Sequence, residues 1–109
     1  MIINETELIA TIRSIPDFPK EGILFRDITT LLKNADAYET LVESIAEKLR
    51  PLDVDIVIGP EARGFVIGSA VAYAVHAGFV LARKPGKLPC EVNSVSYGLE
   101  YGSDRLEIH

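Results

Sequence analysis

Residues 54–64 read Val-Asp-Ile-Val-Ile-Gly-Pro-Glu-Ala-Arg-Gly, and this stretch decides the fold class. Its first five residues form an apolar run interrupted only by Asp55, which is typical of a buried strand. An apolar helix-like run follows over 62–77, and a second apolar run follows over 79–83. A helix between two apolar strands is a βαβ unit, which implies a parallel sheet with a right-handed crossover. The sequence therefore predicts an α/β fold with a parallel sheet.

The turn between the first strand and the helix, Gly59–Gly64, favours an anionic ligand. A glycine-bearing turn that opens a helix presents backbone N–H groups at the positive end of the helix dipole. A second stretch, Arg83-Lys84-Pro85-Gly86-Lys87, is the basic segment and holds three cations in five residues. Both stretches follow strand ends, where open α/β sheets bind ligands, so we expect them to lie together. They favour a small phosphorylated ligand.

Composition limits the class of protein. At 109 residues, 48% of them hydrophobic, the chain is one small domain or part of one. The formal charge of −5 argues against nucleic acid and anionic membranes as general partners. Cys90 is the sole cysteine, so no internal disulfide forms and a reducing cytoplasm is expected. The residues from Met1 to Asn4 do not have the basic-then-apolar pattern of a leader and no apolar run reaches about 18 residues, so neither secretion nor membrane spanning is expected.

The flanking segments predict further helices and strands. A helix is expected to begin at Asn4–Glu7, and its apolar face would carry Leu8, Ile12 and Ile15. Asp27 is a plausible N-cap for a helix over 28–33, and 34–50 has the clearest amphipathic helical pattern. Residues 95–101 and 105–108 predict strands or a hairpin around Gly102–Asp104. The helix over 62–77 is apolar nearly all round, which predicts a buried helix.

Five segments, in order and with matching spacing, resemble the adenine phosphoribosyltransferases, purine-salvage enzymes with the type I phosphoribosyltransferase fold. They are Ile-Pro-Asp-Phe-Pro at 15–19, Gly-Ile-Leu-Phe-Arg-Asp-Ile at 22–28, Glu-Ala-Arg-Gly-Phe at 61–65, Arg-Lys-Pro-Gly-Lys-Leu-Pro at 83–89 and Tyr-Gly-Leu-Glu-Tyr-Gly at 97–102. The resemblance implies a single incomplete domain over 1–109. Its N-terminal helix and hood segment would occupy 1–34, and a partial α/β core with a mobile loop near 88–102 would occupy 35–109.

The family's activity follows by the same resemblance. Its members transfer a phosphoribosyl group from phosphoribosyl pyrophosphate to adenine, giving AMP and pyrophosphate. Mg²⁺ arrives with the substrate, so no metal ligand is expected in the protein, and a homodimer is implied. The residues that match the adenine hood are Leu24, Phe25 and Arg26, the hood segment. Phe25 offers an aromatic face to a purine, and the backbone around it can read the purine edge.

The resemblance also assigns pyrophosphate-binding and catalytic residues. Six positions match the pyrophosphate-binding segments: Glu61, Ala62, Arg63, Arg83, Lys84 and Lys87. Arginine suits bidentate phosphate contacts, whereas lysine acts more as a point charge. Glu100 and Tyr101 match the mobile catalytic loop. Glu100 would act as acid and base toward an imidazole nitrogen of the purine, and loop closure would exclude water from the reacting centre.

The sequence departs from the family in one motif. The two aspartates and Thr-Gly-Gly-Thr turn that bind the ribose 5-phosphate have no counterpart before the last residue, His109. We therefore expect a fragment that is inactive alone and prone to associate through open sheet edges. The alternative is a non-catalytic purine- or phosphate-sensing module on the same fold.

Each candidate residue also has a purely structural interpretation. Gly59 and Gly64 would permit a tight turn and close helix packing, and the basic segment would be a solvated charged loop. Phe25 would be ordinary core, which is the default for phenylalanine. Glu100 would be a surface residue of a strand. These interpretations stay open at the level of the sequence.

Overall fold

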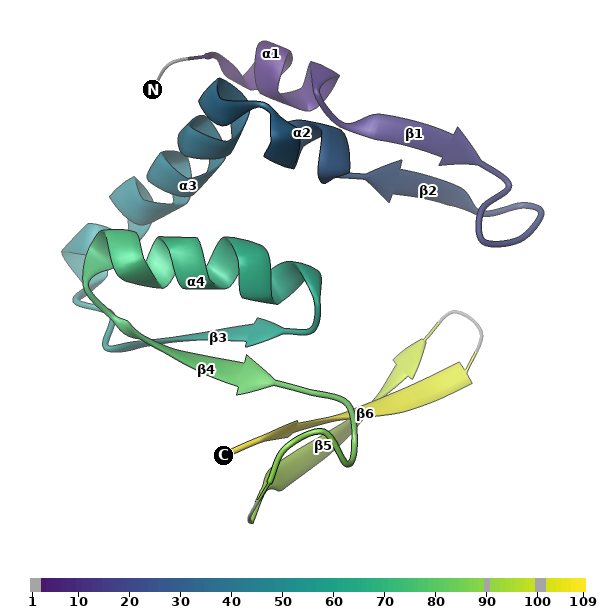
Figure 1. The fold of residues 1–109 in the computed structure, drawn as a ribbon, viewed down its shortest axis with the longest axis vertical. Helices are drawn as coiled ribbons and strands as arrows, with labels where there is room; N and C mark the ends of the chain where they lie inside the picture. Colours follow the sequence, from purple (N-terminus) through teal and green to yellow (C-terminus); the bar gives the residue numbers. More distant parts are fainter. Residues whose placement is uncertain (1–2, 90, 100–101) are drawn as a thin grey trace. The chain divides into compact units, whose positions relative to one another are not determined.

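A computed structural model describes residues 3–89, 91–99 and 102–109 (Figure 1). The chain forms two compact units, Met1–Glu47 and Lys48–His109. The first unit contains α1 (Glu5–Ala10), β1 (Arg13–Pro16), β2 (Leu24–Asp27), α2 (Thr29–Lys33) and all but the last two residues of α3 (Ala35–Leu49). The second contains a 3-10 turn η1 (Arg50–Leu52), β3 (Ile56–Pro60), α4 (Arg63–Val75), β4 (Gly78–Ala82), β5 (Asn93–Leu99) and β6 (Gly102–Ile108). The expected single domain with a division after residue 34 stays a prediction.

The first helix starts where the sequence predicts and ends earlier. The Asn4 side chain accepts a hydrogen bond from the Glu7 N–H (2.8 Å), and the Glu7 carboxylate accepts one from the Asn4 N–H (3.4 Å). This is a capping box, which stabilises a helix start. The helix ends at Ala10, so the predicted face shared with Ile12 and Ile15 is wrong. Ile15 lies in β1 instead, because Arg13–Pro16 pairs with β2.

Strands β1 and β2 form an antiparallel hairpin in which Ile15 lies opposite Phe25. Its loop is ordered by Asp17, which adopts a left-handed conformation (φ 55°) and accepts a hydrogen bond from the Gly22 N–H at 3.0 Å. The Phe18 N–H also donates to the Ile23 carbonyl at 3.1 Å. The loop is therefore closed by polar contacts made within it.

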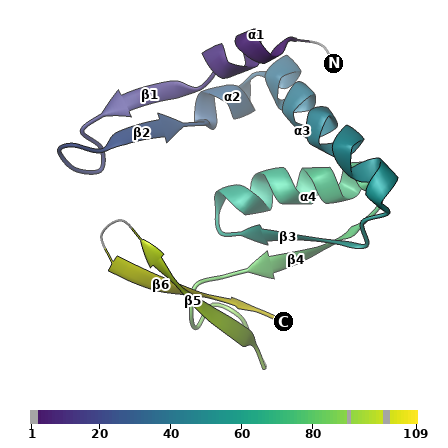
Figure 2. The ribbon, with the colours of Figure 1, turned by 180° about the vertical axis from the view of Figure 1, so that it is seen from behind.

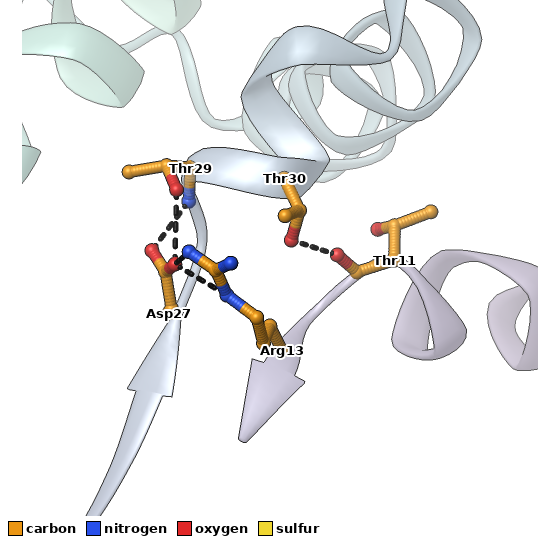
Figure 3. A network of polar contacts seen from close by, with 5 residues as sticks. All are labelled: Thr11, Arg13, Asp27, Thr29 and Thr30. Atoms are coloured by element: carbon orange, nitrogen blue, oxygen red, sulfur yellow. Dashed lines mark hydrogen bonds and ion pairs between the residues drawn. The ribbon is translucent and has the colours of Figure 1, made fainter. Parts of the chain in front are cut away.

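A carboxylate joins this hairpin to the helix that follows. Asp27, at the end of β2, accepts hydrogen bonds from the Thr29 N–H (2.9 Å), the Thr29 hydroxyl (3.0 Å) and the Arg13 guanidinium (Figure 3). These contacts lower the pKa of Asp27 from 3.8 to about 2, the backbone hydrogen bond from Thr29 being the largest cause. The predicted N-cap residue is therefore wrong by one position. Ile28 occupies the N-cap position, and the Asp27 side chain accepts its hydrogen bond from the N–H of Thr29, the first residue of α2.

The third helix confirms the clearest amphipathic prediction. The Asn34 side chain accepts from the Ala37 N–H (3.1 Å) and so caps the helix start. The small residues Ala37, Thr40 and Ala46 are buried along α3, and Leu31 is buried on α2. Thr40 is a buried polar residue whose hydroxyl accepts from the Ile3 N–H at 3.3 Å. Its burial is therefore matched by a hydrogen bond.

The second unit contains the βαβ unit that the sequence predicts. Strands β3 and β4 pair in parallel, with Ile56 opposite Gly78 and Pro60 opposite Ala82. Helix α4 runs beside this pair in both ribbon views (Figure 1, Figure 2). Only Val71 and Ala72 of its described residues are buried, and Tyr73 is 90% exposed. The expectation of a helix buried on all sides is therefore wrong for this chain.

Glycines allow α4 to approach the strands closely. A Cβ on Gly59 would lie 2.3 Å from the Gly64 carbonyl oxygen, and one on Gly68 would lie 2.7 Å from the Phe79 ring. Phe79 meets Phe65 edge to face, with ring centroids 6.3 Å apart. A methyl group at either glycine would push the helix and strand apart.

The last two strands form an antiparallel hairpin. Asn93 lies opposite Ile108, and Leu99 lies opposite Gly102. The hairpin confirms the prediction, but Gly102, Ser103 and Asp104 belong to β6 rather than to a turn. No helix among the described residues is long and apolar enough to cross a membrane.

Candidate functional site

The strand–helix turn and the basic segment lie side by side, as predicted. Pro60 and Ala82 are paired at the carboxyl ends of β3 and β4, and the Glu61 N–H donates to the Ala82 carbonyl at 3.0 Å. Both stretches therefore leave the parallel pair at the edge where α/β folds bind ligands. Ala62 occupies the N-cap position of α4, and Arg63 is its first helical residue.

The Glu61 side chain joins the two stretches. Its Oε1 atom accepts a hydrogen bond from the Lys84 N–H at 2.7 Å and lies 3.4 Å from Arg83 Nε. The Lys84 backbone bond is the largest cause that lowers the pKa of Glu61, and the positive charge of Arg83 lowers it further. The carboxylate thus faces the basic segment. The side chain carries the same sign of charge as an anionic ligand, and the Glu61 N–H already donates to the Ala82 carbonyl in this structure.

Arg83 is held from two sides. Besides its ion pair with Glu61, its guanidinium carbon lies 5.7 Å from the centroid of the Phe65 ring, a cation–π distance. The buried Nε atom lacks a well-directed hydrogen bond, so its contact with Glu61 is an ion pair only. Arg63, Lys84 and Lys87 are exposed in contrast. The four basic candidate residues for pyrophosphate binding therefore divide into one held arginine, Arg83, and three exposed cations.

The basic segment folds into a tight turn. The Lys87 N–H donates to the Lys84 carbonyl at 3.3 Å, and Gly86 has φ 81°. Proline followed by a glycine at positive φ is the residue pattern of a type II turn. The Gly86 N–H donates to Glu107 Oε1 at 3.0 Å, and Glu107 also pairs with Arg83 through the backbone. Sequence reasoning missed Glu107, and no local pattern around it indicates this contact.

The structural interpretation of the glycines is supported. A Cβ on Gly64 would lie 2.4 Å from Cδ of Pro60, and the clash at Gly59 involves the Gly64 backbone. Close packing alone therefore requires glycine at both positions. The same packing brings the start of α4 against the end of β3, which is the geometry that an anion-binding helix terminus needs.

The hood segment lies in the first unit. Leu24 is 52% exposed, whereas Phe25 is half-buried and meets Phe18 edge to face with ring centroids 5.1 Å apart. The Arg26 guanidinium donates to the Ser14 hydroxyl at 2.6 Å. Among the described residues β2 has one strand neighbour, β1, so its other edge keeps unpaired backbone groups. Phe18 is an aromatic partner that sequence reasoning did not single out.

The predicted catalytic residues, Glu100 and Tyr101, lie outside the described residues. Their role stays a prediction, as do the binding roles of the other candidate residues. Within the described ranges, no three His, Cys, Asp or Glu side chains are grouped so that they could hold a metal ion.

Comparisons with known proteins agree with the resemblance. No protein-family model matches the chain. The adenine phosphoribosyltransferase of Alkaliphilus metalliredigens is 60% identical over 98 residues, which cover 90% of this chain and 58% of that protein. The crystal structure of adenine phosphoribosyltransferase from Thermoanaerobacter pseudethanolicus is 52% identical with a TM-score of 0.89, over 95% of this chain and 60% of that one.

A ligand-bound structure matches as well. Adenine phosphoribosyltransferase from Saccharomyces cerevisiae, complexed with an imino-altritol 1,6-bisphosphate and adenine, is 38% identical with a TM-score of 0.87. The match covers 94% of this chain and 61% of that one. The chain spans about three fifths of the length of the relatives it matches, 58% in one and 62% in another. In sequence and in fold, the chain is thus recognised as a match to part of the adenine phosphoribosyltransferases, and it carries the α/β fold of that family.

Proposed function

We propose that the protein transfers a phosphoribosyl group from phosphoribosyl pyrophosphate to adenine, giving AMP and pyrophosphate. The observation that carries the proposal is the junction of the strand–helix turn with the basic segment at the carboxyl ends of β3 and β4. It places a helix start and four cations on the loops of one sheet edge. The Saccharomyces cerevisiae relative binds adenine together with a bisphosphate, which is the ligand chemistry this edge favours.

In this proposal the second unit binds the leaving pyrophosphate. Negative charge grows on the pyrophosphate as its bond to the ribose breaks, so fixed donors and cations nearby stabilise the transition state more than the ground state. Backbone N–H groups at Ala62 and Arg63 would supply the helix-terminus contribution. Arg63, Lys84 and Lys87 would supply the charge, and Arg83 would hold its place between Glu61 and Phe65. Mg²⁺ would enter as the complex with phosphoribosyl pyrophosphate.

The first unit would bind adenine. The free edge of β2 offers backbone donors and acceptors around Leu24 to Arg26, and Phe25 offers an aromatic edge or face. Glu100 would move the proton of an imidazole nitrogen, and Tyr101 would close over the site with it. We also propose a homodimer and a cytoplasmic location. The location is inferred from the single cysteine, Cys90, because proteins of oxidising compartments tend to be richer in cysteine pairs.

The test is turnover by the full-length protein with phosphoribosyl pyrophosphate, Mg²⁺ and one purine at a time. We expect adenine to exceed hypoxanthine and guanine by a factor on the order of 10⁴ in kcat/KM, because the wrong purine leaves buried hydrogen-bonding groups unpaired. Equal use of adenine and hypoxanthine would contradict the assigned hood segment. Tight binding of adenine and pyrophosphate without any AMP formation would instead favour the sensing module.

A further inference from the structure

We propose that Glu107 is a positioning residue that holds the turn of the basic segment in shape for the pyrophosphate group. The inference rests on the proposed function, which supplies the anion. Glu107 lies on β6, more than twenty positions along the chain from Arg83, and it has no place among the residues that the resemblance assigns. We infer its role from its contacts with the basic segment alone.

Glu107 holds the basic segment at two points. Its backbone exchanges two hydrogen bonds with Arg83: the Arg83 N–H donates to the Glu107 carbonyl (2.8 Å), and the Glu107 N–H donates to the Arg83 carbonyl (2.7 Å). Its carboxylate then accepts from the Gly86 N–H at 3.0 Å. The segment is therefore fixed both where it leaves β4 and at the third residue of its turn.

Glu61 makes the corresponding contact from the other side. Its carboxylate accepts from the Lys84 N–H at 2.7 Å, two residues before Gly86. Two carboxylates from different elements thus bind two backbone amides of one four-residue turn. The side chains of Lys84 and Lys87 remain exposed.

This arrangement is costly for a site that binds an anion. Each carboxylate repels the ligand and offsets one of the cations near it. The cost is offset if the carboxylates fix a turn that would otherwise be mobile. Gly86 has more conformational freedom than any other residue type, and a turn ordered in advance loses less entropy when a ligand binds. If Glu107 positions the turn, its removal should lower the affinity for pyrophosphate. If Glu107 acts only through its negative charge, its removal should raise that affinity.

The experiment measures pyrophosphate–Mg²⁺ affinity by titration calorimetry on the full-length protein, with amide hydrogen exchange at Gly86 as the second readout. Glu107→Ala removes the charge and the acceptor. Glu107→Met removes both as well but keeps nearly the same side-chain length, so it separates the loss of the carboxylate from a loss of packing in the hairpin. Glu107→Gln removes the charge but keeps an acceptor oxygen. Glu91→Ala, at an exposed carboxylate of the same unit outside both strands of the hairpin, is the charge control.

We expect Glu107→Ala and Glu107→Met to weaken pyrophosphate binding about tenfold and to speed Gly86 exchange, the size that follows from losing a hydrogen bond to a charged group. Glu107→Gln should bind at least as tightly as the wild type, and Glu91→Ala should bind like it. Tighter binding by all three Glu107 variants would mean that only the charge matters and would overturn the inference. Faster Gly86 exchange with unchanged affinity would overturn it too. Failure of the wild type to bind pyrophosphate would instead overturn the proposed function, and this inference with it.

Discussion

Two carboxylates, one at a strand end in each unit, both accept a hydrogen bond from a backbone N–H, but the two contacts join different parts of the fold. Asp27, at the end of β2, accepts hydrogen bonds from Thr29, two residues away, and from Arg13 on the paired strand. Glu61, just after β3, accepts from Lys84, 23 positions along the chain. Both contacts lower the pKa of the carboxylate, and in both the backbone donor is the largest cause. The first contact ties the hairpin to α2, whereas the second joins two loops at the edge where we propose that the ligand binds.

Both carboxylate side chains are largely buried, 9% exposed for Asp27 and 16% for Glu61, but their surroundings differ. Asp27 bonds to Arg13 and Thr29, and the Thr30 hydroxyl separately donates to the Thr11 carbonyl, so these polar contacts link the end of α1, the hairpin and α2 (Figure 3). The residues around Glu61 include the exposed cations Arg63, Lys84 and Lys87. Polar contacts in the first region therefore stabilise the fold, whereas we propose that those in the second prepare a surface for a charged ligand.

The largest expected effect is on folding, through Asp27→Ala. The substitution removes the acceptor of four hydrogen bonds, two from Arg13 and two from Thr29, and leaves their donors without this partner, which costs more than removing both partners would. We expect a fall in melting temperature several times that of Glu21→Ala, a control at an exposed carboxylate in the loop of the same hairpin. Calorimetric melting of the full-length protein checks this. A melting temperature equal to that of the control would show that the cluster does not stabilise the first unit.

The apolar runs predict more of the fold than of the site. The βαβ unit follows from the runs at 54–58 and 79–83, because two parallel strands need a crossover connection, usually a helix. The strands are less buried than their apolar sequences suggest, since Ile56 and Ile58 are 51% and 54% exposed. The helix start at Asn4 and the helix over 34–50 follow from local side-chain patterns. Ile15 shows where this fails: its helical spacing from Leu8 is outweighed by strand pairing with Phe25, which no local pattern records.

The basic residues of the candidate site can be predicted from short stretches of sequence, whereas the contacts that hold them in place join segments far apart in the chain. The helix start, the lysines and the turn at Pro85 and Gly86 are visible as residue types in a short stretch. The bonds from Lys84 to Glu61 and from Gly86 to Glu107 join segments 23 and 21 residues apart, so only the pairing of strands reveals them. The edge-to-face contact of Phe18 with Phe25 likewise depends on how the hairpin loop closes.

A second effect should appear in binding and leave folding nearly unchanged. Arg63→Ala and Lys87→Ala each remove an exposed cation from the ligand edge. We expect pyrophosphate affinity to fall by about 10- to 100-fold, which corresponds to losing about 1.5–3 kcal/mol of charged hydrogen bonding. Titration calorimetry measures the affinity, and a thermal melt of each variant provides the stability. Lys33→Ala, at an exposed lysine of α2 in the first unit, is the matched control.

The contrast between the regions fails if these variants melt far below the wild type and bind pyrophosphate normally. Arg63 and Lys87 would then be structural residues, and the solvated charged loop would be the correct interpretation of the basic segment. A loss of affinity in Lys33→Ala equal to that in Lys87→Ala would point to net charge alone.

The smallest effect is the pH dependence of stability that Asp27 confers. Its pKa in the folded protein is about 2, against 3.8 for the unperturbed group. Because the folded value lies below the unfolded one, the ionised carboxylate stabilises the folded state fully above pH about 4, and that stabilisation is lost as the pH falls towards about 2. We therefore expect the gap in free energy of unfolding between the wild type and Asp27→Asn to be constant from neutral pH to about pH 5 and to shrink between about pH 4 and 2. Urea unfolding of both proteins across this range measures the gap. A gap that stays constant down to pH 2 would show that the contacts of Asp27 do not depend on its charge, and the first region would then owe its stability to packing.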